Sequence, residues 1–380
     1  MASLLSISSA SSLFMLFFLL FLQAFAPYST AQEAAGGERR PLVPAMFVFG
    51  DSLIDNGNNN NLPSLAKANY LPYGIDFAGG PTGRFANGYT IADGIGELLG
   101  LPLIPPFSQV SGNINSAING VNYASAAAGI LDISGRNFVS LIPFNQQIRN
   151  FASTMEQFST ILGAQTASDS IARSVLFIGF GSNDYLNNYL MPNYNTRFQY
   201  DGDQFSDLLI QHYSNQLETL YNLGARRFII ANVGVLGCIP YVLSQNLTSH
   251  CSSEVNNLVI NFNSKLQPML RNLNTNLQGS QFLHMDIYNM FKDILENPRK
   301  YVQFKKTSKE KRQPESSRRR ATAQIQCGQS RLLRNWKKQW ADQLPSISDS
   351  MPKQRPVCLL GRLPSFISCK YQTGKKVFQW

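Results

Sequence analysis

The sequence predicts an α/β fold, in which helices cover both faces of a parallel β-sheet. Between residue 41 and about residue 301, short apolar runs alternate with longer segments whose apolar residues recur at helical spacing. This alternation is typical of strand–helix–strand crossovers, which place parallel strands side by side. The chain has 380 residues, of which 44% are hydrophobic, so it can bury one large core or two smaller ones.

Four short apolar runs, rich in β-branched and aromatic residues, are expected to be strands. They span residues 45–49, 175–179, 227–233 and 281–287. Three longer segments are expected to be amphipathic helices, and they span residues 141–158, 205–223 and 253–277. Pro268 marks a candidate kink in the last of these helices.

The first 31 residues are expected to be a secretory signal peptide. Residues 13–26 are almost wholly apolar, and Ser29, Thr30 and Ala31 offer small residues for cleavage. The apolar run is short for a membrane span. No Lys or Arg precedes it, unlike most signal peptides, so a retained membrane anchor stays as the alternative. No other segment approaches the length of a membrane span, so stable membrane insertion is not expected.

Ser52 is the candidate nucleophile. The apolar run 45–49 stops at Gly50-Asp51-Ser52 and gives way to a stretch dense in Asn, Asp and Gly. Such a pattern predicts a buried strand that ends in a tight loop and presents one hydroxyl at the carboxyl edge of the sheet. Ligands and chemistry lie at this edge in open α/β sheets. The simpler alternative is that Gly-Asp-Ser is only a turn.

Four segments together resemble the plant GDSL esterase/lipases of the SGNH-hydrolase superfamily. The segment 47–58 contains Phe-Gly-Asp-Ser-Leu and Asp-Asn-Gly-Asn, and the segments 120–130, 179–185 and 232–240 resemble further blocks of that family in the same order. The resemblance covers about residues 41–301. It implies a three-layer α/β/α sandwich of the flavodoxin-like SGNH type, with the C-terminal part missing or replaced.

The resemblance implies a secreted serine ester hydrolase that cleaves acyl esters through an acyl-enzyme. Ser52 is then the nucleophile and donates its own N–H to the oxyanion, together with the side chain of Asn183. We expect the N–H of Gly129 to be the third donor, although Ala126–Ala128 replace glycines that are common in this block. Asp55 is expected to hydrogen-bond the Asn-rich loop rather than to take part in catalysis.

The remaining implications concern ligands and location. No cofactor and no metal are expected, and no Cys or His spacing is typical of a zinc site. The expected partner is a small-molecule or lipid ester, whose identity the motifs do not encode. The protein is expected to be an extracellular monomer of the apoplast or cell wall.

A general base is missing from the sequence as written. A Ser hydroxyl needs a neighbour that removes its proton, and the family supplies this neighbour in an Asp-x-x-His element near the C-terminus. The chain has only three histidines, His212, His250 and His284, and none has Asp three residues before it. Each is more typical of a structural residue. The alternative function is therefore a catalytically impaired or inactive secreted product.

The last 79 residues differ in character from the rest of the chain. Residues 302–380 hold 18 of the 33 basic residues and only 4 of the 23 acidic ones, so they carry a formal charge of +14, whereas residues 1–301 carry −4. A basic tail can bind anionic polymers, but the chain has no nucleic-acid-binding motif and nucleic acid is not an expected partner. We expect this tail to be disordered or poorly packed.

A shift of reading frame explains both the tail and the missing base. Read one base downstream with suitable synonymous codons, residues 357–365 permit a string that contains Asp-Ala-Phe-His, and residues 366–380 permit a string like the family's closing helix. The hypothesis is that the reading frame departs from that of the family just after residue 301, with a retained intron as one source. A genuine basic extension is the alternative.

Two cysteines in the first part of the chain are candidates for a disulfide, since secretion permits one. Cys238 and Cys251 bracket a short polar stretch and could close it as a loop. Asn246, in the sequence Asn-Leu-Thr within this stretch, is a candidate glycosylation site.

Overall fold

The computed structural model describes residues 40–110, 113–245, 250–300, 302–303 and 326–327. All of these except Arg40 belong to one compact unit that begins at Pro41. The predicted signal peptide and nearly all of the predicted tail therefore lie outside the described residues. Within the described part of the chain, no helix is both long and apolar enough to cross a membrane.

A parallel sheet of four strands forms the centre of the unit. The strands are β1 Met46–Gly50, β2 Val175–Gly179, β3 Arg227–Ala231 and β4 Gln281–Met285, and they lie in this order. Their register pairs Gly50 with Gly179, Gly179 with Ala231 and Ala231 with Met285, so all four strands end level with one another. On the free side of β1, Asn122 pairs with Val48 as an isolated bridge.

The helices of the described residues connect these strands. They are α2 Ile91–Leu98, α3 Phe107–Val110, α4 Phe144–Leu162, α5 Ala164–Arg173, α6 Ser182–Asp184, α7 Thr196–Gln199, α8 Gly202–Asn222, α9 Pro240–Gln245, α10 Ser253–Asn276 and α11 Ile287–Glu296. A π-helical turn, Tyr185–Tyr189, continues α6. Beyond α11, Val302–Gln303 (β5) and Gln326–Cys327 (β6) form a small antiparallel pair.

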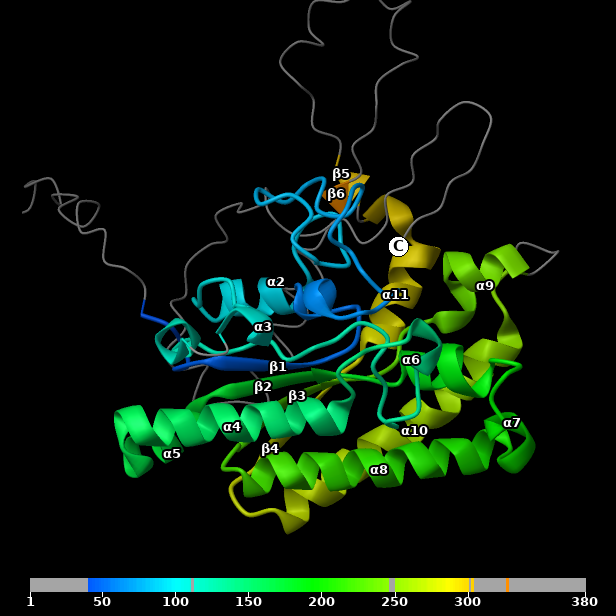
Figure 1. Cartoon of the computed structure of the whole chain (residues 1–380). Helices are drawn as coiled ribbons and strands as arrows, with labels where there is room; N and C mark the ends of the chain where they lie inside the picture. Colours follow the sequence, from blue (N-terminus) through cyan, green and yellow to red (C-terminus); the bar gives the residue numbers. More distant parts are fainter. Residues whose placement is uncertain (1–39, 111–112, 246–249, 301, 304–325, 328–380) are drawn as a thin grey trace, which may run out of the picture. The chain divides into compact units, whose positions relative to one another are not determined.

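The sheet buries an apolar layer on each face, and the two layers follow from the alternation of side chains along a strand. In β1, Phe47 and Phe49 belong to the larger cluster, which packs against α4, α8 and α10. Met46 and Val48 point to the opposite face and pack in a second cluster with residues of α2 and α11. Figure 1 shows α4 and α8 on one side of the sheet and α2 on the other. The fold is therefore a three-layer α/β/α sandwich.

The predicted elements are all confirmed, with modest differences in their bounds. The strands β3 and β4 each end two residues earlier than expected. The three predicted helices correspond to α4, α8 and α10, and α10 runs for 24 residues with Pro268 inside it. The candidate kink does not interrupt this helix, because its buried residues continue on both sides of Pro268 and hold the two halves on one face of the sheet.

Several helices were not expected from the sequence, and one of them carried a readable signal. The side chain of Thr90 accepts a hydrogen bond from the N–H of Asp93, and the Asp93 carboxylate accepts one from the N–H of Thr90. This capping box starts α2, and its Thr-x-x-Asp spacing is visible in the sequence. The helix α11 likewise begins at Asp286, whose carboxylate accepts from the N–H of Asn289.

Candidate active site

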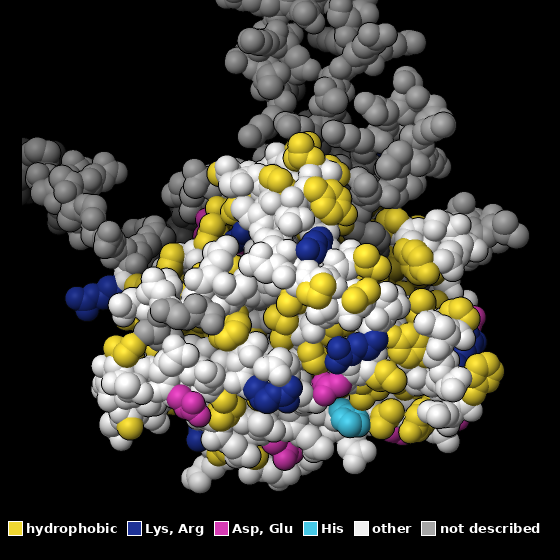
Figure 2. Space-filling view, viewed as in Figure 1, with side chains coloured by type: hydrophobic (Ala, Val, Ile, Leu, Met, Phe, Trp, Pro, Cys, Tyr) yellow, Lys and Arg dark blue, Asp and Glu magenta, His cyan; other side chains and the backbone are white. Residues whose placement is uncertain are grey.

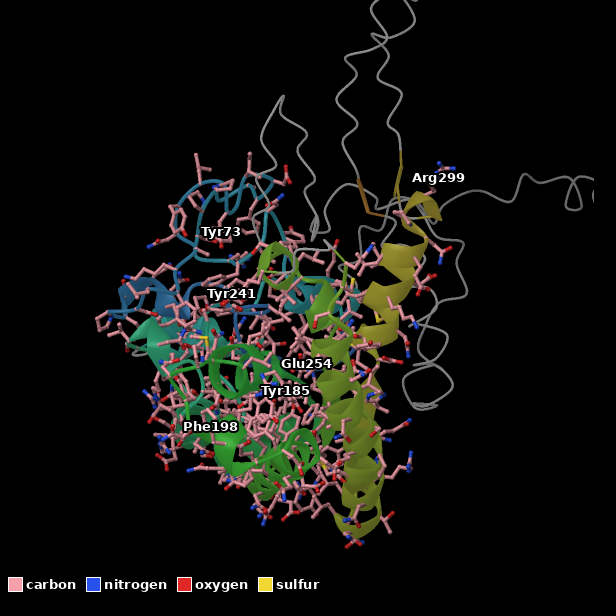
Figure 3. All side chains as sticks on the ribbon, turned by 90° about the vertical axis from the view of Figure 1, so that its right-hand side faces the viewer. Tyr73, Tyr185, Phe198, Tyr241, Glu254 and Arg299 are labelled. Atoms are coloured by element: carbon pink, nitrogen blue, oxygen red, sulfur yellow. A yellow bond between two sulfur atoms is a disulfide. The ribbon has the colours of Figure 1, made fainter. Side chains whose placement is uncertain are left out.

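The predicted site residues follow neighbouring strands and meet at one edge of the sheet. Gly50 and Gly179 pair at the carboxyl ends of β1 and β2. Ser52 comes two residues after Gly50, and Asn183 comes four residues after Gly179. Since the carboxyl ends of parallel strands lie together, both residues belong to the same edge. Figure 3 is turned toward this edge, where the labels Tyr73 and Tyr241 mark the loop that follows β1 and the helix α9.

The segment 120–130 reaches the same edge because it runs alongside β1. The N–H of Tyr123 donates to the carbonyl of Val48 over 2.8 Å, and the N–H of Ser125 donates to the carbonyl of Gly50 over 3.0 Å. The residues that follow Ser125, including Gly129, are therefore held beside the turn that carries Ser52.

The turn of Ser52 uses almost all of its own hydrogen-bonding groups. The Asp51 side chain accepts from the N–H of Leu53 over 2.9 Å, and the Asp51 carbonyl accepts from Ile54 and Asp55 over 3.3 and 3.0 Å. Among the described residues, neither the N–H nor the hydroxyl of Ser52 has a hydrogen-bond partner. Ser52 is partly buried, and its N–H and hydroxyl are available to a ligand, whereas the N–H groups of Leu53, Ile54 and Asp55 are bonded to Asp51.

The end of β1 is fixed just before the turn. The side-chain amide of Gln147 accepts from the N–H of Gly50 over 3.0 Å and donates to its carbonyl over 2.9 Å. A side chain at Gly50 would place its Cβ 2.7 Å from the carbonyl oxygen of Gly179 and against Ile54. Glycine is therefore required here by lack of space, which explains the first residue of the Gly-Asp-Ser string.

The Asn-rich loop, which lies in the segment 47–58, is hydrogen-bonded to the segment 120–130. One oxygen of the Asp55 carboxylate accepts from the N–H groups of Gly57 and Asn58, over 2.8 and 2.9 Å. The other oxygen accepts from the N–H of Ala126 over 2.9 Å. The Asn58 side chain donates to the carbonyl of Ala124 over 2.7 Å. The prediction that Asp55 organises this loop is confirmed.

Ala127 adopts a backbone conformation that the sequence did not predict. The N–H of Ala128 donates to the carbonyl of Ser125 over 3.1 Å, which closes a four-residue turn. Ala127 has a φ of 70° in this turn, a left-handed conformation that favours glycine. Its N–H has no partner among the described residues. The signal in the sequence was the replacement of family glycines by Ala126–Ala128.

Gly129 occupies a different environment from Ala127. An added Cβ would lie 2.6 and 2.7 Å from the two carboxylate oxygens of Asp184. That carboxylate accepts from the N–H groups of Ile130 and Leu131, over 2.8 and 3.0 Å, and from the hydroxyl of Ser134. Glycine at 129 thus makes room for the buried Asp184, which holds the loop that follows.

Asn183 is buried and held by two neighbours. Its side-chain NH₂ donates to the carbonyl of Ala128 over 2.9 Å, and its side-chain oxygen accepts from Asn187 over 2.6 Å. The second N–H of this amide is left for another acceptor. Because the C=O and N–H of a trans peptide point in opposite directions, the N–H of Gly129 points away from the Asn183 amide.

Three buried carboxyl groups surround this region and share one electrostatic feature. Burial raises the pKa of Asp51 to about 7, and the nearby charge of Asp184 raises it further. Burial also raises the pKa of Asp55 to about 6 and that of Asp184 to about 6, although hydrogen bonds to both carboxylates act in the opposite direction. These groups therefore gain or lose protons between pH 5 and 8.

The histidines do not reach the nucleophile. His284 lies in β4, three strands away from β1, and strands are spaced about 4.8 Å apart, so about 14 Å separates the two strands. Its buried Nε2 has no partner among the described residues, and burial lowers its pKa while Asp286 opposes this shift. His212 is exposed on α8, and His250 is exposed next to Cys251. None of the three is hydrogen-bonded to Ser52.

The remaining predictions concern a disulfide, a glycosylation site and metal binding. Cys238 and Cys251 form a disulfide, with their Cα atoms 4.4 Å apart. Asn246 lies outside the described residues. In the described ranges, no group of three or more His, Cys, Asp or Glu side chains is arranged to hold a metal ion.

The sequence of the chain is similar to that of a family of ester hydrolases. A family model described as GDSL-like lipase/acylhydrolase matches residues 46–312. A GDSL esterase/lipase of Arabidopsis thaliana is 59% identical over 261 residues, which are 68% of this chain and 67% of the relative. GDSL esterase/lipase 7 of Arabidopsis thaliana is 49% identical over 270 residues, or 70% and 74% of the two chains.

The chain belongs to the GDSL-like lipase/acylhydrolase family, and it is a carboxylic ester hydrolase by this kinship. A solved carbohydrate esterase structure aligns with 64% of this chain and 59% of its own, at 13% identity and a TM-score of 0.29. That likeness is too low to carry an argument about the site.

Proposed function

We propose that this protein is a secreted serine ester hydrolase that cleaves acyl esters through an acyl-enzyme on Ser52. The observation that carries the proposal is that, among the described residues, the N–H and the hydroxyl of Ser52 have no partner, whereas the N–H groups of the next three residues of the turn are all bonded to Asp51. An unpartnered donor at the carboxyl edge of a parallel sheet is suited to bind a substrate atom.

In the proposed mechanism the Ser52 oxygen attacks the ester carbonyl carbon, and the carbonyl oxygen becomes negatively charged. The N–H of Ser52, the N–H of Ala127 and the second N–H of the Asn183 amide donate to this oxygen. The alcohol then leaves, and water hydrolyses the acyl-Ser52 ester. Removal of one such donor costs about 2.7–4 kcal/mol of transition-state stabilisation in enzymes that use an oxyanion hole.

We propose that the N–H of Ala127, rather than that of Gly129, is the donor that the segment 120–130 supplies to the oxyanion. Two arguments support this assignment. The N–H of Ala127 is unpartnered in a turn that the Asp55 carboxylate holds through Ala126. The N–H of Gly129 points away from Asn183, since the carbonyl of the same peptide accepts from Asn183. A backbone donor survives the replacement of glycine by alanine when the left-handed conformation is kept.

Secretion is part of the proposal for two reasons. Residues 1–31 have the apolar run and the small residues of a signal peptide. The disulfide between Cys238 and Cys251 fits an oxidising compartment. Acyl-chain preference and the nature of the alcohol are not part of it.

The nucleophile is tested by substitution. In the protein with the alternative reading frame restored, Ser52→Ala should abolish hydrolysis of short p-nitrophenyl esters, because the acyl-enzyme of the proposed mechanism forms on Ser52. Ser153→Ala is the matched control, since Ser153 is exposed on α4 and lies in no part of the proposed site. Unchanged turnover in the Ser52→Ala protein would remove Ser52 from the mechanism.

The missing base is tested by the reading frame. We propose that the Asp-x-x-His element lies in the alternative frame of residues 357–365, so the restored-frame protein should hydrolyse esters far faster than the 380-residue chain. Catalysis without a base falls to what the oxyanion hole and binding supply, about 10³–10⁴ over water in serine proteases. Equal rates for the two proteins would overturn the frame hypothesis, and a base would then be sought among the three histidines.

A further inference from the structure

Six large apolar side chains are exposed on two segments beside the candidate site. Leu65, Tyr70, Leu71 and Ile75 belong to the long loop between the Asn-rich turn and α2, and Ile133 and Val139 belong to the loop before α4. We call these six residues the apolar rim. Leu65 is 74% exposed, Leu71 is 68% exposed and Val139 is 62% exposed. In Figure 2, hydrophobic side chains gather at the top of the described surface, over the long loop.

The two segments of the rim are joined to each other and to the candidate site. The N–H of Leu65 donates to the carbonyl of Phe138 over 3.1 Å, which brings Leu65 next to Val139. The side chain of Asn59 donates both to the carbonyl of Ala66 and to that of Ala126, over 3.0 and 3.2 Å. These bonds place Leu65 and Val139, at one end of the rim, near the turn that holds the proposed donor Ala127.

The long loop is held in place, so the exposure of its apolar side chains is a feature of the folded state. The ring of Tyr73 packs edge-on against Tyr70 and Phe85, at centroid distances of 5.4 and 5.7 Å. The N–H of Gly74 donates to the carbonyl of Ala86 over 2.9 Å. Arg84 forms a buried ion pair with Asp93 of α2 at 3.0 Å. Folded proteins rarely expose grouped apolar residues without a binding role.

The charge of the long loop indicates what kind of partner the rim fits. The loop residues 62–90 contain two cations, Lys67 and Arg84, and one anion, Asp76, and the charge of Arg84 is balanced by its ion pair with Asp93 of α2. The Lys67 ammonium donates to the carbonyl of Asn60 over 3.0 Å and is turned toward its own loop. A surface with apolar projections and no net charge matches an uncharged, apolar partner. The loop before α4 adds one cation, Arg136, and one anion, Asp132, so the rim has no excess of cations that would select an anionic partner.

We propose that the apolar rim binds the surface of a neutral lipid aggregate, with Leu65, Leu71 and their neighbours inserted among the acyl chains. Such insertion puts the carboxyl edge of the sheet, and with it Ser52, against the lipid surface. The proposal goes beyond ester hydrolysis, because surface binding requires neither Ser52 nor a general base.

The test is flotation of the full 380-residue protein with phosphatidylcholine vesicles in 0.5 M sodium chloride. The neutral lipid and the salt suppress attraction through the basic tail. The protein should float with the vesicles, and the Leu65→Ser/Leu71→Ser double variant should lose at least about tenfold in partition coefficient, since each leucine contributes apolar burial. Ser52→Ala should float like the parent, which separates this proposal from the proposed function.

A matched control and a folding check complete the experiment. Ile161→Ser removes an apolar side chain of similar exposure, 55%, from the far end of α4, and it should float like the parent. Circular dichroism and the melting temperature should be the same for the parent and for the Leu65, Leu71 and Ile161 variants, since these three side chains are exposed. No flotation by the parent, or equal flotation by the double variant, would overturn the proposal. A dimer in solution that the double variant abolishes, without vesicle binding, would assign the rim to a second copy instead.

Discussion

The carboxyl ends of β1 and β4 carry polar residues in similar positions but use them differently. After β4, the Asp286 carboxylate accepts from the side chain of Asn232 and from both the N–H and the side chain of Asn289. This carboxylate caps α11, and both of its oxygens accept hydrogen bonds. After β1, the donors of Ser52 have no partner in the part of the chain that the structure describes. A polar group at the carboxyl edge of the sheet is therefore a candidate ligand-binding group when its hydrogen-bond donors have no protein partner. When all of its hydrogen bonds are made within the protein, its role is structural.

The largest expected effect concerns the donors at the two strand ends. In the active, restored-frame enzyme, Asn183→Ala should lower kcat by about 10²–10³ with little change in KM, because its bond to the oxyanion strengthens only as charge develops. Asn289→Ala at the end of β4 should leave kcat unchanged. Steady-state kinetics on a p-nitrophenyl ester measures both. A change in KM alone for Asn183→Ala would make Asn183 a ground-state contact.

The next effect separates the two residues of the second block. Gly129→Ala should lower the free energy of unfolding by about 1–3 kcal/mol, because the new Cβ meets the Asp184 carboxylate at 2.6 Å. Ala127→Gly should raise it by up to about 1 kcal/mol, because a left-handed φ is strained for alanine. Since Ala127→Gly keeps the N–H, kcat should not fall. Urea unfolding and initial rates check both outcomes, and a large loss of kcat in Ala127→Gly would contradict the assignment.

The smallest effects are two pH dependences of opposite sign. The pKa of Asp51 is raised by burial from 3.8 to about 7. Between about pH 4 and 7 the folded state therefore holds a proton that the unfolded chain has released, so stability falls as pH rises through this window. Asp51→Asn keeps an acceptor for the N–H of Leu53 and should flatten this fall. Chemical denaturation between pH 4 and 8 measures it.

The pH dependence of stability that Asp286 causes should have the opposite sign to that of Asp51. Burial opposes ionisation of its carboxylate, but the hydrogen bonds from Asn289 and Asn232 outweigh burial and lower its pKa. Its contribution to stability is therefore complete above the ordinary aspartate pKa and is lost as pH falls through the lowered value. Asp286→Asn should flatten only the acid limb below about pH 4. If Asp51→Asn and Asp286→Asn altered the same limb, the contrast between the two strand ends would fail.

Local sequence determined the strands, the chief helices and the positions of Ser52, Asp55 and Asn183. Apolar runs of strand length form strands wherever both faces are covered, and residues that directly follow parallel strands must meet at one edge. The loop role of Asp55 was also readable, because its partners, Gly57 and Asn58, are near in sequence. The short helices α2 and α11 were missed, although a capping signal preceded α2.

Only the tertiary structure decided which residue of the segment 120–130 has a backbone N–H available as a donor to the oxyanion. Whether an N–H is free depends on bonds between segments far apart in the chain, here Asp55 to Ala126 and Asn183 to Ala128. The raised pKa of Asp51 has the same origin, since burial comes from every element packed around it. The exposure of the apolar rim also depends on the tertiary structure. The sequence shows that these side chains are hydrophobic, but only the packing of the whole fold decides whether neighbouring residues cover them.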